Sequence, residues 1–348
     1  MRYLVCGMLL ASACISVPAV SGQTPALRLK SVIVVPDVKG EFDHFAIDLA
    51  GQRLFLAAED QKTVEVFDLS ASKHVSSIKL FARPHGLVFI PASSRLMVAD
   101  GGDGTCKFID VDAPKVSKTV KTALRADSVI YDREAQTIFV ANGGQVAKMD
   151  YSLVTAISAR EERPLGELRI DSKILEAMAV EKVGKRLFLN LMDKNAIAVI
   201  DRATHELITQ WPLVGAGEPS AMAFDENQHR LFVGCRRPGM LLVLDTDSGK
   251  VVASLPSIGH ADDAYYDANH NRIYVSGGEG AVSVYQQNGP DDYQRLPDVP
   301  TGAGAKTSLF VPEWNELFVA LPAGTNSPAQ VMIFMPDGVM RTGKGPAR

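Results

Sequence analysis

The chain has 348 residues, of which 46% are hydrophobic and 22% are charged, and its formal net charge is −4 at pH 7. This composition is typical of a globular protein with a sizeable core. The mild acidity, without a basic stripe that carries interleaved aromatic residues, argues against a nucleic-acid-binding protein and against recruitment to acidic lipid.

The first 22 residues differ from the rest of the chain. Arg2 is their only charged residue, an apolar run over residues 3–13 follows it, and small residues come next. This pattern predicts a secretory signal peptide over residues 1–22, cleaved after Ala19 or Gly22. We therefore expect a periplasmic or secreted protein.

The same leader does not predict a transmembrane segment. Pro18 and several serines interrupt its apolar stretch, which falls short of the roughly twenty unbroken apolar residues that a membrane-spanning helix needs. Cys14 follows a near-match to a bacterial lipoprotein cleavage box, in which Leu10 stands one place too early. A lipid anchor at Cys14 is therefore the lesser alternative to simple cleavage.

After the leader, one sequence unit occurs seven times. Its most regular part is a short apolar strand that begins with Arg-Leu-Phe in its clearest copies, and successive copies start 42 to 49 residues apart. Further apolar runs stand before and after each copy, separated by Asp, Asn, Pro and Gly residues that favour tight turns. The seven copies are RLFLA (53–57), RLMVA (95–99), TIFVA (137–141), RLFLN (186–190), RLFVG (230–234), RIYVS (272–276) and ELFVA (316–320).

Four short strands in each period of about forty residues are the signature of a β-propeller blade, as in WD40-like repeats. We therefore predict an all-β, seven-bladed β-propeller of four-stranded antiparallel blades. It should form a single domain over residues 23–348, because no linker interrupts the period. The blades are expected at about residues 41–80, 83–122, 126–170, 174–213, 218–256, 261–299 and 305–336.

Three blades depart from the pattern. The last lacks a fourth strand, and we predict that LRLKSVIVV (27–35) supplies it by pairing with the third strand of that blade and closing the ring. In the third blade, where the period is longest, we expect QVAKMDY (145–151) as the third strand and SAREERP (158–164) as an inserted surface loop. In the sixth blade, QRLPDV (294–299) fits the fourth-strand position poorly.

These repeats resemble the YVTN-repeat β-propellers, and the exported chain is similar to the periplasmic YncE-like proteins. The nearest local matches are FVANGG (139–144), VIDRATHELI (199–208) and YVSGG (274–278), and the resemblance covers about residues 28–336. It implies the propeller architecture. It does not imply one activity, because related propellers include lactonases, quinone-cofactor dehydrogenase subunits, surface-layer proteins and proteins of unassigned role.

The first strand of each blade lines the central channel of a propeller, and its start opens at one face. We take the first residue of each Arg-Leu-Phe copy as the anchor of its repeat. The residue ten positions before each anchor is mostly a charged one, and the residue after it is polar in several copies. We predict a ligand site at this channel mouth; the alternative is a solvated polar rim without a ligand. The candidate residues are Asp43, His44, His85, Asp127, Glu176, Asp262, Asp263 and Lys306.

No cofactor is identified from the sequence, and a divalent cation in the central channel stays open. Carboxylates with neutral oxygen donors suit Ca²⁺, whereas His with Asp or Glu suits a transition metal. We interpret DGGDG (100–104) as a hairpin turn and not as a calcium loop, since it lacks the further ligands of an EF-hand. Arg236 and Arg237 are interpreted as a solvated pair.

Two functions remain open at this stage. The first is an exported binding or scaffold propeller, which is favoured because the chain has no P-loop, G-x-S-x-G, H-E-x-x-H or haem-attachment motif. It would be a monomer that engages a small molecule or a protein partner at the mouth. The second is a lactonase-like, metal-assisted hydrolase with His44 or His85 as general base and Asp127, Glu176 or Asp262 as ligands.

Overall fold

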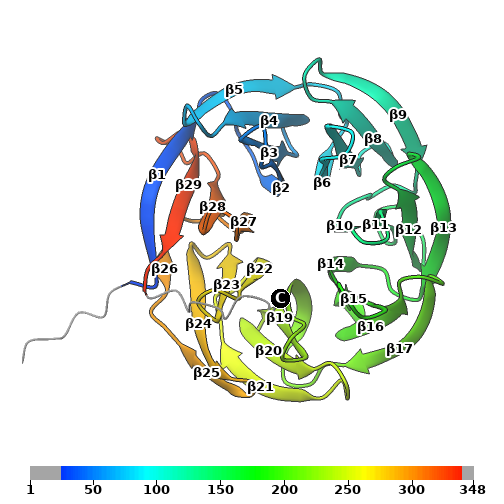
Figure 1. Ribbon diagram of the computed structural model, residues 1–348, viewed down its shortest axis with the longest axis vertical. Helices are drawn as coiled ribbons and strands as arrows, with labels where there is room; N and C mark the ends of the chain where they lie inside the picture. The colour runs from blue at the N-terminus through cyan, green and yellow to red at the C-terminus, as the bar shows by residue number, and fades with distance from the viewer. Residues whose placement is uncertain (1–24, 339–348) are drawn as a thin grey trace, which may run out of the picture.

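The computed structural model describes residues 25–338, which form a ring of seven antiparallel sheets around a central channel (Figure 1). The predicted seven-bladed β-propeller is confirmed, while the predicted signal peptide lies outside the described residues. Blades one to three consist of β2 (Phe42–Asp48), β3 (Arg53–Ala58), β4 (Thr63–Asp68) and β5 (Lys73–Ile78); β6 (Pro84–Ile90), β7 (Arg95–Asp100), β8 (Thr105–Asp110) and β9 (Lys115–Lys121); and β10 (Val129–Asp132), β11 (Thr137–Gly143), β12 (Ser152–Ser158) and β13 (Arg163–Ile170).

The remaining four blades continue the same order around the ring. They consist of β14 (Leu175–Val180), β15 (Arg186–Leu191), a short 3₁₀ turn η1 (Met192–Lys194), β16 (Ala196–Asp201) and β17 (Glu206–Pro212); β18 (Gly217–Asp225), β19 (Arg230–Arg237), β20 (Met240–Asp245) and β21 (Val251–Pro256); β22 (Ala261–Asp267), β23 (Arg272–Gly277), β24 (Ala281–Gly289), β25 (Asp292–Arg295) and β26 (Val299–Pro300); and β27 (Ser308–Val311), β28 (Glu316–Leu321), β29 (Ala329–Pro336) and β1 (Leu27–Val35).

The turn from the first to the second strand has the same hydrogen-bonded conformation in several blades. The aspartate that ends the first strand accepts a hydrogen bond from the backbone N–H three residues later, as at Asp48 and Asp132. The residue just before the second strand, such as Gln52 (φ 50°) or Ser94 (φ 52°), is left-handed. This local turn explains why an acidic residue precedes Arg-Leu-Phe at an almost constant spacing.

The Arg-Leu-Phe motif builds the core because adjacent strand residues point to opposite faces of a sheet. In blade one, Leu54 packs in the hydrophobic layer shared with blade seven, whereas Phe55 packs in the layer shared with blade two. Leu187 and Phe188 divide in the same way between the two neighbours of blade four. The core is therefore a ring of seven apolar layers, one between each pair of neighbouring blades.

The N-terminal strand closes this ring as predicted. β1 pairs antiparallel with β29, the third strand of the last blade, and takes the outermost position in that sheet (Figure 1). Ile33 and Val35 point inward and join the apolar layer between blades seven and one, while Val34 between them points outward. The last blade is thus completed by a segment nearly 300 residues away in sequence, since Val35 pairs with Ala329.

The predicted position of the third strand in blade three, residues 145–151, was wrong. Its third strand is β12 (Ser152–Ser158), and the outer strand β13 already begins at Arg163. The extra residues of this blade lie instead between β11 and β12, at residues 144–151, where the chain reaches the channel face. QVAKMDY alternates too poorly to form a strand, whereas SLVTAIS supplies the buried positions that the sheet needs.

The irregular sixth blade is confirmed. Two short strands, β25 and β26, share the outer position against β24 instead of one continuous strand. The two cysteines of the described residues, Cys106 and Cys235, are buried and unpaired in different blades, and burial raises the pKa of each thiol to about 12. Within residues 25–338, no helical segment is long and apolar enough to cross a membrane.

The closing strand should contribute to stability through its inward side chains. We expect Ile33→Ala to lower the free energy of unfolding by about 2–4 kcal/mol, because it empties a buried site. Val34→Ala on the same strand should cost less than about 1 kcal/mol, because Val34 is 49% exposed. Urea denaturation followed by circular dichroism measures both, and equal effects would contradict the role of β1 in the core.

Candidate functional site

The seven innermost strands open into a cavity of about 390 Å³ at one face of the ring. Every one of the seven positions ten residues before an Arg-Leu-Phe anchor lines this cavity, so the repeat register read from the sequence brings one residue of each blade to one place. These residues are Asp43, His85, Asp127, Glu176, Ser220, Asp262 and Lys306.

Some residues at the next position along the first strands also line a cavity. His44 and Ser128 still line the mouth cavity, whereas Asp263 lies below it and lines a second cavity of about 200 Å³ that His44 also reaches. The channel becomes apolar at this depth, which separates the charged mouth from the rest of the channel. The apolar residues that line the lower cavity include Phe45, Leu87, Val129, Met178, Met222 and Ala264.

Four further charged residues line the mouth that were not predicted from the sequence as site residues: Glu59, Arg83, Arg125 and Arg236. They come from two further columns of the same repeat. Glu59 and Arg236 each lie six residues after the start of their anchor strand, and Arg83 and Arg125 each lie twelve residues before it. Reading these two columns together with the first would have found them.

Arg236 also corrects the interpretation of the arginine pair. Its guanidinium donates to Asp262 at 2.6 Å and to the backbone carbonyl of Ala261 at 3.1 Å, inside the cavity. Arg237 is solvated as expected, with 70% of its side chain exposed. The two differ because consecutive residues of β19 face opposite sides of the sheet.

DGGDG is a structural turn, as interpreted from the sequence. The buried carboxylate of Asp100 accepts hydrogen bonds from the backbone N–H groups of Ala82 and Arg83, both at 2.7 Å. It also accepts from Lys107 at 2.6 Å. This carboxylate therefore holds the loop that presents Arg83 at the mouth.

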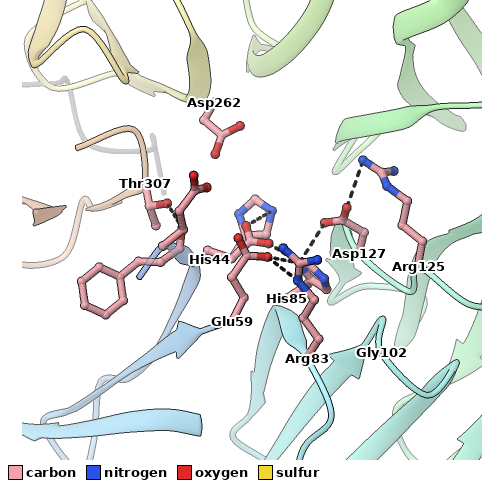
Figure 2. A network of polar contacts seen from close by, with 12 residues as sticks. His44, Glu59, Arg83, His85, Gly102, Arg125, Asp127, Asp262 and Thr307 are labelled. Atoms are coloured by element: carbon pink, nitrogen blue, oxygen red, sulfur yellow. Dashed lines mark hydrogen bonds and ion pairs between the residues drawn. The ribbon is translucent and has the colours of Figure 1, made fainter. Parts of the chain in front are cut away.

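Charges of opposite sign alternate around the cavity. Arg125 lies 3.2 Å from Asp127 of its own blade (Figure 2) and 3.1 Å from Glu176 of the next blade. Across the ring, Asp262 pairs with Arg236 and lies 3.8 Å from the ammonium of Lys306. The polar side chains of the mouth are thus already paired with one another.

His85 is the centre of the most crowded part of the mouth (Figure 2). Its Nδ1 lies 2.5 Å from Asp43 Oδ2, 3.4 Å from Glu59 Oε2 and 3.9 Å from Asp127 Oδ1. His44 lies on the other side of Asp43, with its Nε2 3.4 Å from Asp43 Oδ1. Two imidazoles and three carboxylates from three blades therefore meet in one corner of the cavity.

Two glycines make this crowding sterically feasible. A Cβ added to Gly101 would lie 2.7 Å from Cδ2 of His85, so only glycine leaves room for the ring. A Cβ added to Gly86 would lie 2.3 Å from the backbone carbonyl oxygen of Asp127. Gly86 therefore lets the first strands of blades two and three approach closely.

Burial and pairing move the pKa values of these groups in opposite directions. Burial raises the pKa of Asp43, but the His44 charge and the hydrogen bond from His85 outweigh it and hold that pKa far below its usual range. Burial lowers the pKa of both histidines, but the carboxylates beside them raise it, in His44 well above the usual value. The neighbouring carboxylates therefore favour the protonated form of both rings.

Glu176 shows the opposite balance. Burial raises its pKa, Arg125 lowers it and Asp127 raises it again, which leaves the pKa at about 7. Burial likewise raises the pKa of Asp262, in spite of the nearby Lys306. The two sides of the mouth differ because two imidazoles contact Asp43, whereas Glu176 has Arg125 as its ion-pair partner and shares it with Asp127, whose charge raises the pKa of Glu176.

Two groups of three side chains could hold a metal ion by geometry. Asp43, Glu59 and His85 form one group, and Asp43, His44 and Asp127 form the other. In each group the potential ligand atoms all lie within 4.8 Å of one another. The donors are imidazole nitrogen and carboxylate oxygen, a mixture that transition metals accept.

Comparisons with known proteins support the fold alone. No family model matches the chain, and no curated protein matches it. A chain in the "Crystal Structure of Mitotic Checkpoint Complex" is 14% identical with a TM-score of 0.74, covering 97% of this chain and all of that chain. A chain of "Kuenenia stuttgartiensis Hydrazine Synthase" is 16% identical with a TM-score of 0.63, covering 72% of this chain and 84% of that one.

The raised pKa of Glu176 predicts a pH-dependent effect on stability. Because its folded pKa of about 7 exceeds the usual 4.5, this group favours folding most below pH 4.5, and that contribution is lost as pH rises toward 7. Glu176→Gln removes the titration, so its stability relative to wild type should rise by the order of 2 kcal/mol between pH 4.5 and 8.

Thermal melts of both proteins at several pH values measure this difference. Glu134→Gln, at an exposed turn, serves as the control and should show no such trend. A constant difference between Glu176→Gln and wild type across this range would contradict the raised pKa.

Proposed function

We propose that the protein is an exported binding propeller whose mouth cavity takes a small polar molecule that carries charges of both signs. The observation that supports it is the ring of alternating charges around one cavity of about 390 Å³, built by residues of all seven blades. A cavity of this size lies at the lower end of the range for small-molecule sites, so the ligand is small.

The charge pattern decides what kind of molecule fits. Arg125, Arg236 and Lys306 can receive an anionic group, while the carboxylates between them can receive an ammonium or hydroxyl group. An uncharged apolar ligand would strip water from these groups without replacing its hydrogen bonds, at a cost of about 1–3 kcal/mol for each group left unpaired. The cavity therefore selects against apolar ligands.

One side of the mouth adds an apolar contact. Leu124 and Val146 both line the cavity, and 43% and 58% of their surfaces are exposed. Val146 belongs to the longer β11–β12 connection of blade three, so the irregular blade modifies this edge of the site. We infer that the ligand has an apolar portion on the side of blade three.

A metal-assisted, lactonase-like hydrolase is the second candidate, supported by the hydrogen bond between His85 and Asp43 at 2.5 Å inside the cavity. The carboxylates around His85 raise its pKa and so favour the protonated ring over the neutral ring that a general base requires. Ser220 is no free nucleophile, because its hydroxyl donates to the carbonyl of Ala261 at 2.6 Å. Binding is therefore the function that the geometry supports better.

Export, family and oligomeric state belong to the same proposal. We propose a YVTN-like, YncE-like propeller that is periplasmic or secreted, forms one domain over residues 23–348 and works as a monomer. The support is the leader over residues 1–22, the repeat motifs and the closure of the ring by β1, which leaves no blade without its outer strand.

The leader makes a direct prediction for the exported protein. N-terminal sequencing of the protein recovered from the exported fraction should begin at Val20 or Gln23, the residues after the two expected cleavage positions. An intact N-terminus at Met1 would contradict export by a cleaved leader. A lipid-modified terminus at Cys14 would replace the soluble form by an anchored one.

The binding proposal is tested by thermal shift with a panel of amino acids, hydroxy acids and sugar acids. At least one compound should raise the melting temperature of wild type, because a ligand that binds only the folded state stabilises it. Arg236→Gln should reduce that shift, since it removes a cavity cation. Asn227→Ala, on a separate cavity between blades five and six, should leave it unchanged.

If no compound shifts the wild-type melt, or if Arg236→Gln and Asn227→Ala respond alike, the mouth is a solvated rim and the binding proposal is wrong.

A further inference from the structure

We propose a site for one divalent transition-metal cation in the mouth, held by Asp43, Glu59 and His85, with Asp127 within reach. This inference goes beyond the proposed function, because a cation can bind there whether or not an organic ligand does. It rests on geometry that the ion pairs of the mouth do not explain.

The first argument is the convergence of three carboxylates on one nitrogen. Asp43, Glu59 and Asp127 lie 2.5, 3.4 and 3.9 Å from Nδ1 of His85. That nitrogen carries at most one hydrogen, which the short contact with Asp43 already uses. The hydrogen on this nitrogen can therefore bond to only one of the three carboxylates. A metal cation at this point would be coordinated by all three and by the imidazole nitrogen.

Other histidine–carboxylate pairs of the chain provide an internal contrast. Glu65 accepts from His74 at 2.6 Å, and its further hydrogen bonds come from the hydroxyls of Thr63 and Ser77. Asp267 lies 2.7 Å from His270 and accepts from the hydroxyl of Tyr274. These pairs are completed by neutral donors, whereas His85 is surrounded by further carboxylates.

The donors are held in place before any cation arrives. Their side chains are between 9% and 16% exposed, and they come from blades one, two and three. Arg83 donates to Glu59 at 3.1 Å and Arg125 contacts Asp127 at 3.2 Å, so two of the three carboxylates are also held by an arginine. Outer partners of this kind orient the ligands of many metal sites.

The donor set decides the class of cation. One imidazole nitrogen with carboxylate oxygens suits Mn²⁺, Fe²⁺ or Zn²⁺, whereas Ca²⁺ and Mg²⁺ prefer oxygen ligands throughout. His44 strengthens this choice, because it forms a second group with Asp43 and Asp127 whose ligand atoms also lie within 4.8 Å of one another. Asp43 belongs to both groups and is the common ligand.

The test is calorimetric titration of chelator-treated protein with Zn²⁺ and with Mn²⁺, in the absence of any organic ligand. Wild type should bind one equivalent of at least one of these ions. Glu59→Gln and His85→Ala should each weaken binding more than about tenfold. His229→Ala removes the exposed histidine of the His229–Asp247 pair and should bind as wild type does.

Three results would overturn the site: no binding of either ion to wild type, unchanged affinity in both Glu59→Gln and His85→Ala, or equal loss in His229→Ala. Circular dichroism checks that each variant is folded, and Asp127→Asn, which keeps the size of the side chain, replaces His85→Ala if that protein does not fold. Tighter binding of Ca²⁺ than of Zn²⁺ and Mn²⁺ would also contradict the role of His85. The thermal-shift panel contains no metal, so the two experiments are independent. A panel without any stabilising compound would contradict the binding proposal and leave the metal site untouched.

Discussion

Each blade is a sheet with two apolar faces, and the whole molecule depends on the need to cover both. A four-stranded sheet cannot do this alone, so each blade packs between two others and the stack must close on itself. The division of Leu54 and Phe55 between opposite layers shows how two adjacent residues serve both neighbours. The strand β1 closes the stack, since it is the fourth strand of the last blade. It contributes Ile33 and Val35 to the apolar layer between blades seven and one.

Ring closure also creates the site. Because all seven blades have the same orientation, equivalent positions of their first strands meet at one mouth, and residues about forty positions apart in sequence become neighbours. The scaffold residues of the blades are nearly interchangeable, whereas the mouth residues differ from blade to blade. His85 in blade two, Glu176 in blade four and Lys306 in blade seven occupy equivalent positions with three different chemistries. The function therefore resides in the differences between copies.

Within the mouth, burial alone does not decide which groups are charged. Asp43 and Glu176 occupy the same repeat position and burial raises the pKa of both, yet the net pKa falls in Asp43 and rises to about 7 in Glu176. The difference comes from the partners, because two imidazoles contact Asp43 while Arg125 alone is shared between Glu176 and Asp127. Asp43 is thus the more strongly ionised of the two carboxylates, and it is also a ligand of the proposed cation.

The repeat determined much of this in advance. Period, strand alternation and turn residues are local properties, so they predicted seven blades, the closing strand and the column of mouth residues from Asp43 to Lys306. They failed for the third blade, where the apolar alternation of residues 152–158 decided the strand and the extra residues went to the mouth. They also did not single out Glu59 and Arg236, since these stand in a column where other blades have Gly, Met or Pro. Only the tertiary structure decides such contacts, because the direction of a side chain and its distance to another blade depend on how the ring closes.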